Sequence, residues 1–432
     1  MFLLFILLQT NLSTPLKIKE STSLVRPPFE HTLGYYRATP YEVKMMFGKV
    51  LAFKDPRGLA CCKLEAENTP KNRRDDRLTV YCTNSMGSQI IYNKALTTVK
   101  TYGRFGQGRG EFWLPGGIAA SPEGDVYVAD VENNRIVRLK NDIDSMRWIG
   151  TIGAFGCDSS EFSEPWGVTI GNNNQVWVTD KGNNRIQIFD EKGSFIKQLR
   201  NFNAPTAISM ITKEDKWNYY HNEFVVVIDN KDQRIRKLGL DGNIIAGAQA
   251  IPGFKDVDFT GCAIDYYGNV WVTDKKNSCI HKFDRSLRYL DSFQDKFKEP
   301  AGITIGRRYG QVFILSKEAI DYYWVGINAA IGGCYPGVFD PREKGVTVSL
   351  TVSERARIKA TIYNSQNEVI RDLIPNLTLE PFEHNISWDA KDNKGGLVQP
   401  GTYRIEIIAE PTYSSRGSFK RKLETEVVCK YK

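Results

Sequence analysis

The sequence predicts an all-β fold, in which a six-bladed β-propeller is followed by a small β-sandwich. Three observations support this prediction. A glycine-punctuated unit of three short strands recurs along residues 51–335. Its strands are apolar on both faces, as expected where sheets pack face to face. After Gly345 the strands become alternating and are separated by polar turns, which is typical of a sandwich.

The best-defined unit occupies residues 102–139. It opens with a glycine-rich loop, and Pro115-Gly116-Gly117 begins a strand over residues 118–121. Pro122-Glu123-Gly124 is a tight-turn sequence, after which residues 125–130 return as a second strand. Asn133-Asn134 turns the chain into a third strand over residues 135–139. Such a meander cannot bury both of its faces alone, so neighbouring units are required.

The unit returns at regular spacing. Aligning the polar residue that ends each second strand gives intervals of 42 to 50 residues between Asn84, Asp130, Asp180, Asp229, Asp274 and Ser316. Six units of this length predict a closed ring of six blades. We expect either the N-terminal segment 16–50 or the stretch Ala329–Ile331 to complete the outermost strand, because closure removes exposed sheet edges.

Units two and three carry the pattern G-x-F-G…F…P-x-G-I-A…G-x-V-Y-V-A-D…N-x-R-I, which resembles the NHL repeat. The resemblance covers roughly residues 51–335 and is weak in the first and last units. It implies four-stranded sheets around a central channel. In three units an Arg follows the strand-ending Asp by five residues, which predicts structural pairs Asp130/Arg135, Asp180/Arg185 and Asp229/Arg234. Cys279 and Gln89 replace the Arg in the fifth and first units.

Residues 338–432 form the predicted sandwich. The pieces I-Y-N…V-I-R-D-L…W-D-A-K-D-N-K-G-G…P-G-T-Y-R-I are similar to the immunoglobulin-like domain of the flagellar hook-capping family. This resemblance implies an immunoglobulin-like attachment or spacer module. Residues 333–341, rich in Gly and Pro, are expected to be a linker between separate folding units. Asp389 and Asp392 do not have calcium-loop spacing and predict a hydrogen-bonded turn.

The N-terminal run Met1–Leu8 is apolar but too short to span a bilayer as a helix. It resembles the apolar region of a secretory signal peptide, so residues 1–15 are predicted to be a signal peptide and the protein to be secreted or at the cell surface. Because no basic residue precedes the run, a buried first strand in a cytoplasmic protein is the alternative. The eight cysteines match no metal or disulfide framework, which favours buried thiols over a bridge within the first blade.

The charge and the histidine content reduce the number of functions that the sequence favours. The net charge of +8 is spread along the chain, so no domain is a strongly basic platform for RNA. Some propellers of this broad type are lyases that use histidines with zinc or magnesium. Only four histidines are present, and His281 lies on a third strand, away from the channel, where a structural role is expected. The sequence therefore predicts a non-enzyme without a metal or cofactor.

The remaining candidate surface is the loop face, which carries the loops leading into each first strand and those joining second and third strands. We expect it to bind a protein or a glycan through Arg104, Arg109, Trp113, Trp166, Lys181, Asn183, Lys231, Lys275 and Lys276. Trp beside Lys and Arg is typical of interface anchors. The alternative for both tryptophans is burial between blades. Alternative functions are an RNA-binding propeller and a propeller lyase with a metal in the channel.

Overall fold

The computed structural model describes residues 21–27, 37–48, 51–67, 78–94, 98–414 and 417–431. Strands dominate these residues, and their one α-helix, α1 (Pro40–Phe47), begins with a capping box formed by Thr39 and Glu42. The predicted signal peptide and residues 68–77 of the first-blade loop lie outside the described residues. No helix in the described part has the length and apolar character needed to cross a membrane.

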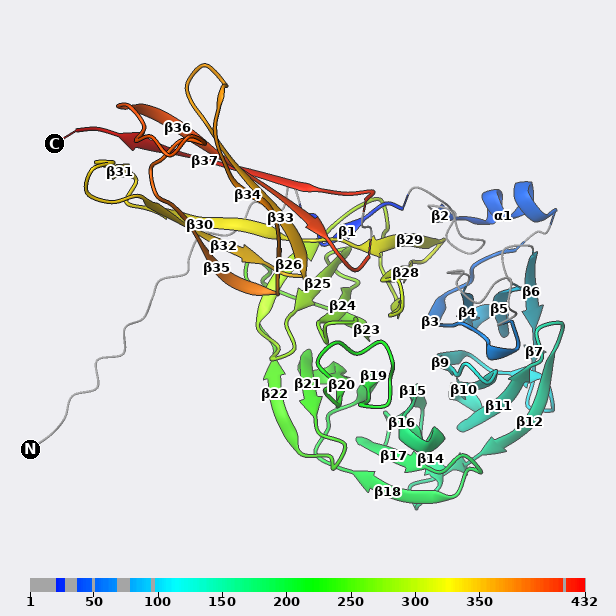
Figure 1. The fold of residues 1–432 in the computed structure, drawn as a ribbon. Helices are drawn as coiled ribbons and strands as arrows, with labels where there is room; N and C mark the ends of the chain where they lie inside the picture. The colour runs from blue at the N-terminus through cyan, green and yellow to red at the C-terminus, as the bar shows by residue number, and fades with distance from the viewer. Residues whose placement is uncertain are drawn as a thin grey trace, which may run out of the picture.

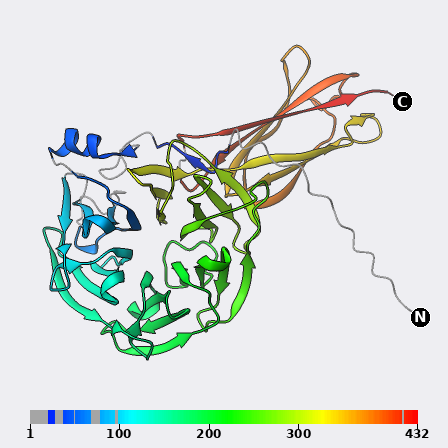
Figure 2. The same ribbon diagram turned by 180° about the vertical axis from the view of Figure 1, so that it is seen from behind.

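Six antiparallel sheets form the blades of a propeller (Figures 1 and 2). Blade one contains β3 (Pro56–Cys62), β4 (Thr79–Asn84), β5 (Gln89–Lys94) and β6 (Thr98–Tyr102). Blade two contains β9 (Pro115–Ala120), β10 (Asp125–Asp130), β11 (Arg135–Asn141) and β12 (Met146–Ile152). Blade three contains β15 (Pro165–Ile170), β16 (Val176–Asp180), β17 (Arg185–Phe189) and β18 (Phe195–Leu199).

The other three blades follow the same order. Blade four contains β19 (Pro205–Ile211), β20 (Phe224–Asp229), β21 (Arg234–Leu238) and β22 (Ile244–Ala248). Blade five contains β23 (Phe259–Ile264), β24 (Val270–Asp274), β25 (Cys279–Phe283) and β26 (Tyr289–Phe293). Blade six contains β27 (Gly302–Gly306), β28 (Gln311–Leu315) and β29 (Ile320–Val325). Short parallel ladders β7 (Arg104–Phe105)–β8 (Glu111–Phe112) and β13 (Ala154–Phe155)–β14 (Glu161–Phe162) lie in the loops before blades two and three.

The ring is closed. Each innermost strand lies against the next, and β27 of blade six lies against β3 of blade one. The N-terminal segment supplies the outer edge of blade six, because β1 (Leu24–Val25) and β2 (Arg37–Ala38) pair with β29. Of the two stretches predicted to close the ring, the N-terminal one therefore does so. The stretch Ala329–Ile331 pairs with β32 instead.

Glycine near the start of the innermost strands allows neighbouring blades to approach. A Cβ on Gly58 would lie 2.4 Å from the carbonyl oxygen of Gly116, and one on Gly167 would lie 2.2 Å from that of Thr206. Thr179 and Asp180 are the last residues of the second strand of blade three. The Thr179 hydroxyl donates a hydrogen bond to the Thr206 carbonyl at 2.6 Å. Since no side chain fits between these backbones, the recurring Pro-x-Gly is explained by steric contact at the channel.

The strands are buried on both faces, as the sequence predicted. Val126 and Val128 are fully buried, Tyr127 is 2% exposed, and Trp177 occupies the equivalent place in blade three. Apolar clusters lie between neighbouring blades, so that the ring has a divided core rather than a single one. The prediction of an all-β propeller is therefore confirmed.

Residues 329–431 form a C-terminal module of two sheets. One contains β30 (Ala329–Tyr335), β32 (Val346–Val352) and β35 (Phe382–Trp388). The other contains β31 (Val338–Phe339), β33 (Ala356–Tyr363), β34 (Val369–Leu379), β36 (Gly401–Pro411) and β37 (Arg421–Cys429). The sheets share one apolar core that includes Trp388 and Tyr403. After Trp388, Asp392 accepts backbone hydrogen bonds from Lys394 and Gly396, which forms the polar turn.

The expected linker at residues 333–341 is occupied by strands. β30 extends to Tyr335, and β31 follows at Val338. Gly333 lies where the β30–β32 register shifts, so it permits an irregularity within a strand rather than ending one. The junction between β29 and β30 is the short stretch 326–328.

The C-terminal module contacts strand β25 and the β23–β24 turn of blade five, and the β27–β28 turn of blade six. Glu354 accepts a hydrogen bond at 2.5 Å from Lys282, and both side chains are 1% exposed. Tyr413 stacks on Tyr266 with ring centroids 4.6 Å apart. In the two ribbon views the module projects from one side of the ring (Figures 1 and 2). These contacts lie opposite the loop face.

All eight cysteines are free thiols, and five of them are buried. Burial raises the pKa of Cys61 to about 11. A disulfide within the first blade is therefore not formed.

Candidate functional site

The loop face is built on the acidic residues that end the second strands. Asp130 accepts hydrogen bonds from the Trp113 backbone at 2.7 Å and from Arg135 Nε at 2.9 Å. Asp180 accepts equivalent bonds from the Ser163 backbone at 2.8 Å and from Arg185 at 2.7 Å. Each carboxylate thus fixes the loop that leads into its own blade. Burial raises the pKa of Asp130, although these donors oppose the shift.

Blade four departs from the predicted pairing. Asp229 binds Arg236 at 2.6 Å, whereas Arg234 donates to the Gln249 side chain at 3.2 Å. Residues two apart on a strand share a face, so either Arg could reach the carboxylate. Gln249, which follows β22, holds Arg234 away. The predicted pair Asp229/Arg234 is therefore wrong, whereas Asp130/Arg135 and Asp180/Arg185 are confirmed.

Trp166 lies at the channel end of the loop face. The Arg57 guanidinium of blade one lies 4.9 Å from the centroid of the Trp166 ring, and the Lys181 ammonium lies 4.7 Å from it. Arg57 of blade one can reach Trp166 of blade three because Gly116 and Gly117 of blade two, which lies between them, have no side chains. Each cation also has an acidic partner, Asp55 for Arg57 and Glu164 for Lys181. The indole is half-buried and is held by two cations.

Exposed aromatic side chains of the loops that lead into blades two and three form an apolar rim on the loop face. Phe105 and Phe155 occupy equivalent positions in the loops before blades two and three, and their exposed fractions are 66% and 74%. Trp113 is 38% exposed and meets Phe105 edge to face at 5.9 Å. Large apolar side chains gathered at one surface mark interaction sites.

The other predicted site residues have different environments. Arg104 is exposed and pairs with Glu111 at 2.9 Å; the Gly108 amide and Arg104 lower the pKa of Glu111. Arg109, Lys231, Lys275 and Lys276 are exposed, and Lys276 pairs with Asp256. Asn183 donates to Asp180 and to the Gly156 carbonyl, so its side chain is engaged within the blade. The structure brings together Trp166 and Lys181, and it also places Arg57, which the sequence analysis did not select, beside them.

The opposite face is covered near the channel. The loop 212–223 between β19 and β20 reaches toward the ring centre (Figures 1 and 2). Its Asp215 binds Arg307 of blade six, and its Tyr219 hydroxyl donates to Glu380 of the C-terminal module at 2.5 Å. The two faces of the propeller are thus unequal, and the loop face is the one that the C-terminal module leaves free.

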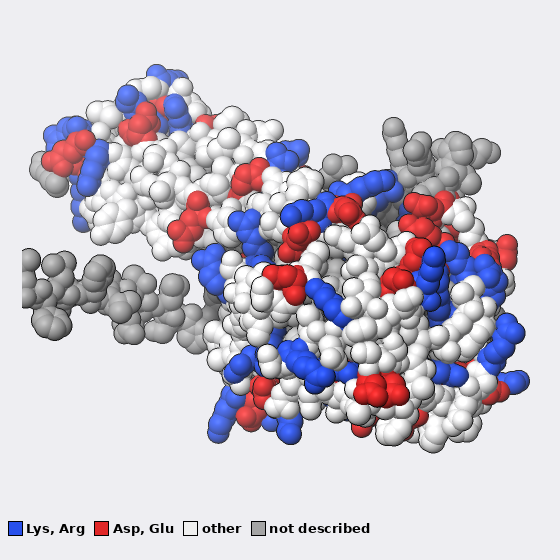
Figure 3. Space-filling model, turned by 90° about the horizontal axis from the view of Figure 1, so that it is seen from below, with Lys and Arg blue, Asp and Glu red and all other residues white. Residues whose placement is uncertain are grey.

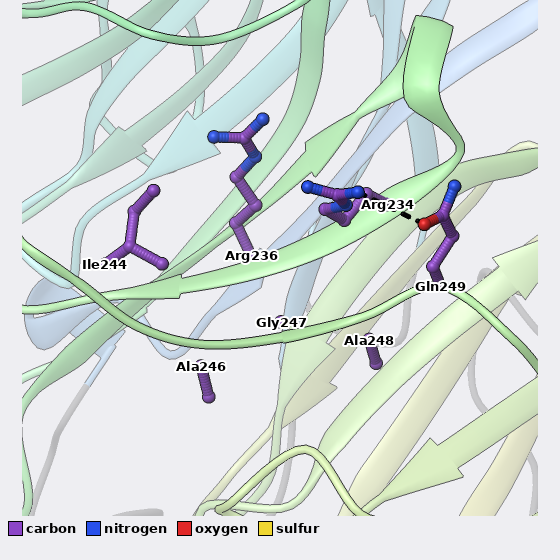
Figure 4. Close-up of a pocket in the computed structure, with 7 residues that line it drawn as sticks. All are labelled: Arg234, Arg236, Ile244, Ala246, Gly247, Ala248 and Gln249. Carbon is purple, nitrogen blue, oxygen red and sulfur yellow. Dashed lines mark hydrogen bonds between the residues drawn. The ribbon is translucent and has the colours of Figure 1, made fainter.

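A groove lies on the outer side of blade four and adjoins the turn between β20 and β21. Arg234, Arg236, Ile244, Ala246, Gly247, Ala248 and Gln249 line it (Figure 4). Both arginines point along the strand surface, but Arg236 is held by Asp229 and Arg234 by Gln249. None of the predicted site residues lines the groove, so it is not the predicted site.

The surface charge is mixed. On the side of the molecule seen in Figure 3, Lys and Arg alternate with Asp and Glu, and neither sign forms a continuous field. A sequence-independent nucleic-acid site requires a cationic track. This side of the propeller does not provide one.

Comparisons with known proteins identify two NHL repeats, at residues 112–139 and 162–189. No curated protein matches the chain. The solved structures similar to it include a streptogramin B lyase, with a TM-score of 0.45 and 17% identity over 64% of this chain and 95% of that one. A gluconolactonase of Xanthomonas campestris has a TM-score of 0.47 and 12% identity, over 71% of this chain and 99% of that one. PorZ, a surface component of the Porphyromonas gingivalis type-IX secretion system, has a TM-score of 0.44 and 13% identity, over 91% of this chain and 54% of that one.

These comparisons correct one prediction. The sequence analysis predicted a non-enzyme, but a lyase and a gluconolactonase are among the structures similar to this chain. The propeller therefore does not exclude catalysis, and the prediction of a non-enzyme is withdrawn. At these identities the similarity shows the fold alone and assigns no reaction.

Proposed function

We propose that this chain binds a protein partner through the loop face of its propeller, centred on Trp166. The observation that carries the proposal is the position of Trp166, half-buried between Arg57 and Lys181 at the channel end of that face. Trp and Arg are the side chains most enriched among interface hot spots. Here they are held in place before a partner arrives, which lowers the entropy lost on binding.

The apolar rim favours a protein over the glycan that the sequence also left open. Phe105, Trp113 and Phe155 extend the surface over two neighbouring blades. Their exposed aromatic rings offer apolar contact area to a protein surface. Two acidic partners, Asp55 and Glu164, keep the site close to neutral, which suits a partner of mixed charge.

The position of the C-terminal module also favours binding at the loop face. It braces the opposite face through Glu354 and Tyr413, so the loop face points away from it. We propose that this module, with its resemblance to an immunoglobulin-like domain, is the attachment or spacer element. The apolar run at residues 1–8 favours a secreted or cell-surface location for the whole protein.

Site-specific photo-cross-linking tests the proposal. A photoreactive phenylalanine analogue replaces Phe155 on the loop face, and the matched control carries it at Ile244, an exposed residue of β22 on the outer wall. In cells that make the protein, the Phe155 probe should capture one discrete protein, and excess unlabelled wild-type chain should suppress the product. The Ile244 probe should not capture it.

Three results would contradict the proposal. Equal capture from both positions would show non-specific contact. Capture of carbohydrate alone would replace the protein partner with a glycan. A partner captured only through probes on the loop 212–223 would place binding on the other face.

A further inference from the structure

The acidic corner of blade five lacks the arginine found in blades two, three and four. Asp130, Asp180 and Asp229 each contact a guanidinium, but Asp274 has Cys279 where Arg135 and Arg185 stand. Like them, Asp274 is fully buried. A buried carboxylate is costly unless a cation or a full set of hydrogen bonds compensates it. The fifth corner must therefore be compensated in another way.

Three metal-ligating side chains converge at this corner. His281 Nε2 lies 3.1 Å from Asp274 Oδ2 and 3.4 Å from Cys279 Sγ. The ligand atoms all lie within 4.8 Å of one another, and all three residues are fully buried. Around a tetrahedral zinc ion, ordinary Zn–N, Zn–O and Zn–S distances separate N from O by about 3.3 Å and N from S by about 3.6 Å. The observed separations approach both values.

The arrangement does not suit a nucleophile with a base. In such a relay the thiol and the carboxylate contact different nitrogens of the imidazole. Here both face Nε2, while Nδ1 lies 2.7 Å from the Ser292 hydroxyl. That hydroxyl also lies 2.8 Å from Tyr289 Oη, so the ring orientation is fixed from behind. An outer hydrogen bond of this kind is the usual support of a metal-binding histidine.

We propose that Asp274, Cys279 and His281 bind a Zn²⁺ ion, which takes the place of the arginine in the other corners. These are the nitrogen, oxygen and sulfur donors that zinc accepts, and a water completes the tetrahedron. On binding, a Zn–S bond forms and the thiol proton passes to solvent, while the carboxylate and the neutral imidazole each donate a lone pair.

Blade three provides a matched control within the same chain. Asp180, Asn183, Arg185 and Gln187 occupy the positions of Asp274, Asn277, Cys279 and His281. The double variant C279R/H281Q therefore rebuilds the corner of blade three in blade five. These side chains reproduce an arrangement that this protein already uses in blade three. Cys262→Ser removes a buried thiol elsewhere in blade five and serves as the second control.

Cobalt substitution tests the site in the full-length protein. The metal-free protein is titrated with Co²⁺, both folded and during refolding, because a fully buried site can require opening before the metal enters. The wild type and Cys262→Ser should bind an equimolar amount of Co²⁺, with a thiolate-to-cobalt charge-transfer band and the visible bands of a tetrahedral ion. Zn²⁺ should displace the signal and raise the melting temperature.

C279R/H281Q and Cys279→Ser should lose the charge-transfer band, and Zn²⁺ should leave the melting temperature of C279R/H281Q unchanged. Absence of the band in the wild type under both protocols would overturn the proposal. A band that persists in C279R/H281Q would do the same, since another cysteine would then be the ligand.

Discussion

Replacing Arg185 with Met should destabilise the propeller strongly. Arg185 is 2% exposed and donates to Asp180, to the carbonyls of residues 157, 158 and 161, and to Gln198. Met fills similar volume but leaves the Asp180 carboxylate buried without its cation. Removing one partner of a buried ion pair costs about 3–5 kcal/mol. For a chain of this size the melting temperature should fall by on the order of 10 °C.

Chemical denaturation and thermal melting of Arg185→Met measure this cost. Arg104→Met is the matched control, because Arg104 is 78% exposed and an exposed ion pair such as that with Glu111 contributes little to stability. Adding Asp180→Asn to Arg185→Met should recover part of the loss, since no uncompensated charge then remains. If Arg185→Met costs no more than Arg104→Met, the buried pairs do not hold the loop face.

Three further predictions concern the ring closure, the lysines and the N-terminus. Burial raises the pKa of Asp321 on β29 to about 6, so the stability associated with its protonated form is present below pH 4 and lost as the pH rises through 6. Asp321→Asn should therefore stabilise the protein by roughly 2–3 kcal/mol at pH 8 and leave it unchanged near pH 4, as measured by denaturation at both pH values. The pair Lys275→Glu and Lys276→Glu should weaken partner binding several-fold without changing the melting temperature, because both side chains are exposed; unchanged binding would exclude this part of the loop face. N-terminal sequencing of the extracellular protein should begin near Ser13 or Thr14, whereas an extracellular protein that retains Met1 would contradict the signal peptide.

The propeller could be predicted because its repeat has a direct physical cause. Gly58 and Gly167 recur where blades meet, and the strand-ending Asp recurs because it must bind its own loop. Each constraint operates once per blade, so it leaves a periodic trace in the sequence. No periodic pattern in the sequence marks the strands that close the ring. These strands, β1 and β2, pair with β29, which is about 300 residues further along the chain.

The candidate site was harder to predict because it depends on contacts between blades. Arg57 and Trp166 belong to blades one and three, and only the ring geometry brings them together. The loop position of Asn183 in the sequence predicts an exposed side chain. In the structure this side chain donates a hydrogen bond to Asp180 of its own blade. The repeated G-x-F-G of residues 103–106 and 153–156 could have pointed to Phe105 and Phe155. Cys279 replaces the repeated Arg, and that departure marks the fifth corner in the sequence.

The affinity of the cross-linked partner for Trp166→Ala tests the central proposal most directly. Trp148 of β12 provides the control, because it is also half-buried and also contacts a cation, Arg135, but lies on the outer strand of blade two. With both variants folded, Trp166→Ala should weaken binding by roughly thirtyfold, about 2 kcal/mol, and Trp148→Ala should leave it unchanged. Equal affinities for wild type and folded Trp166→Ala would contradict binding through the loop face centred on Trp166.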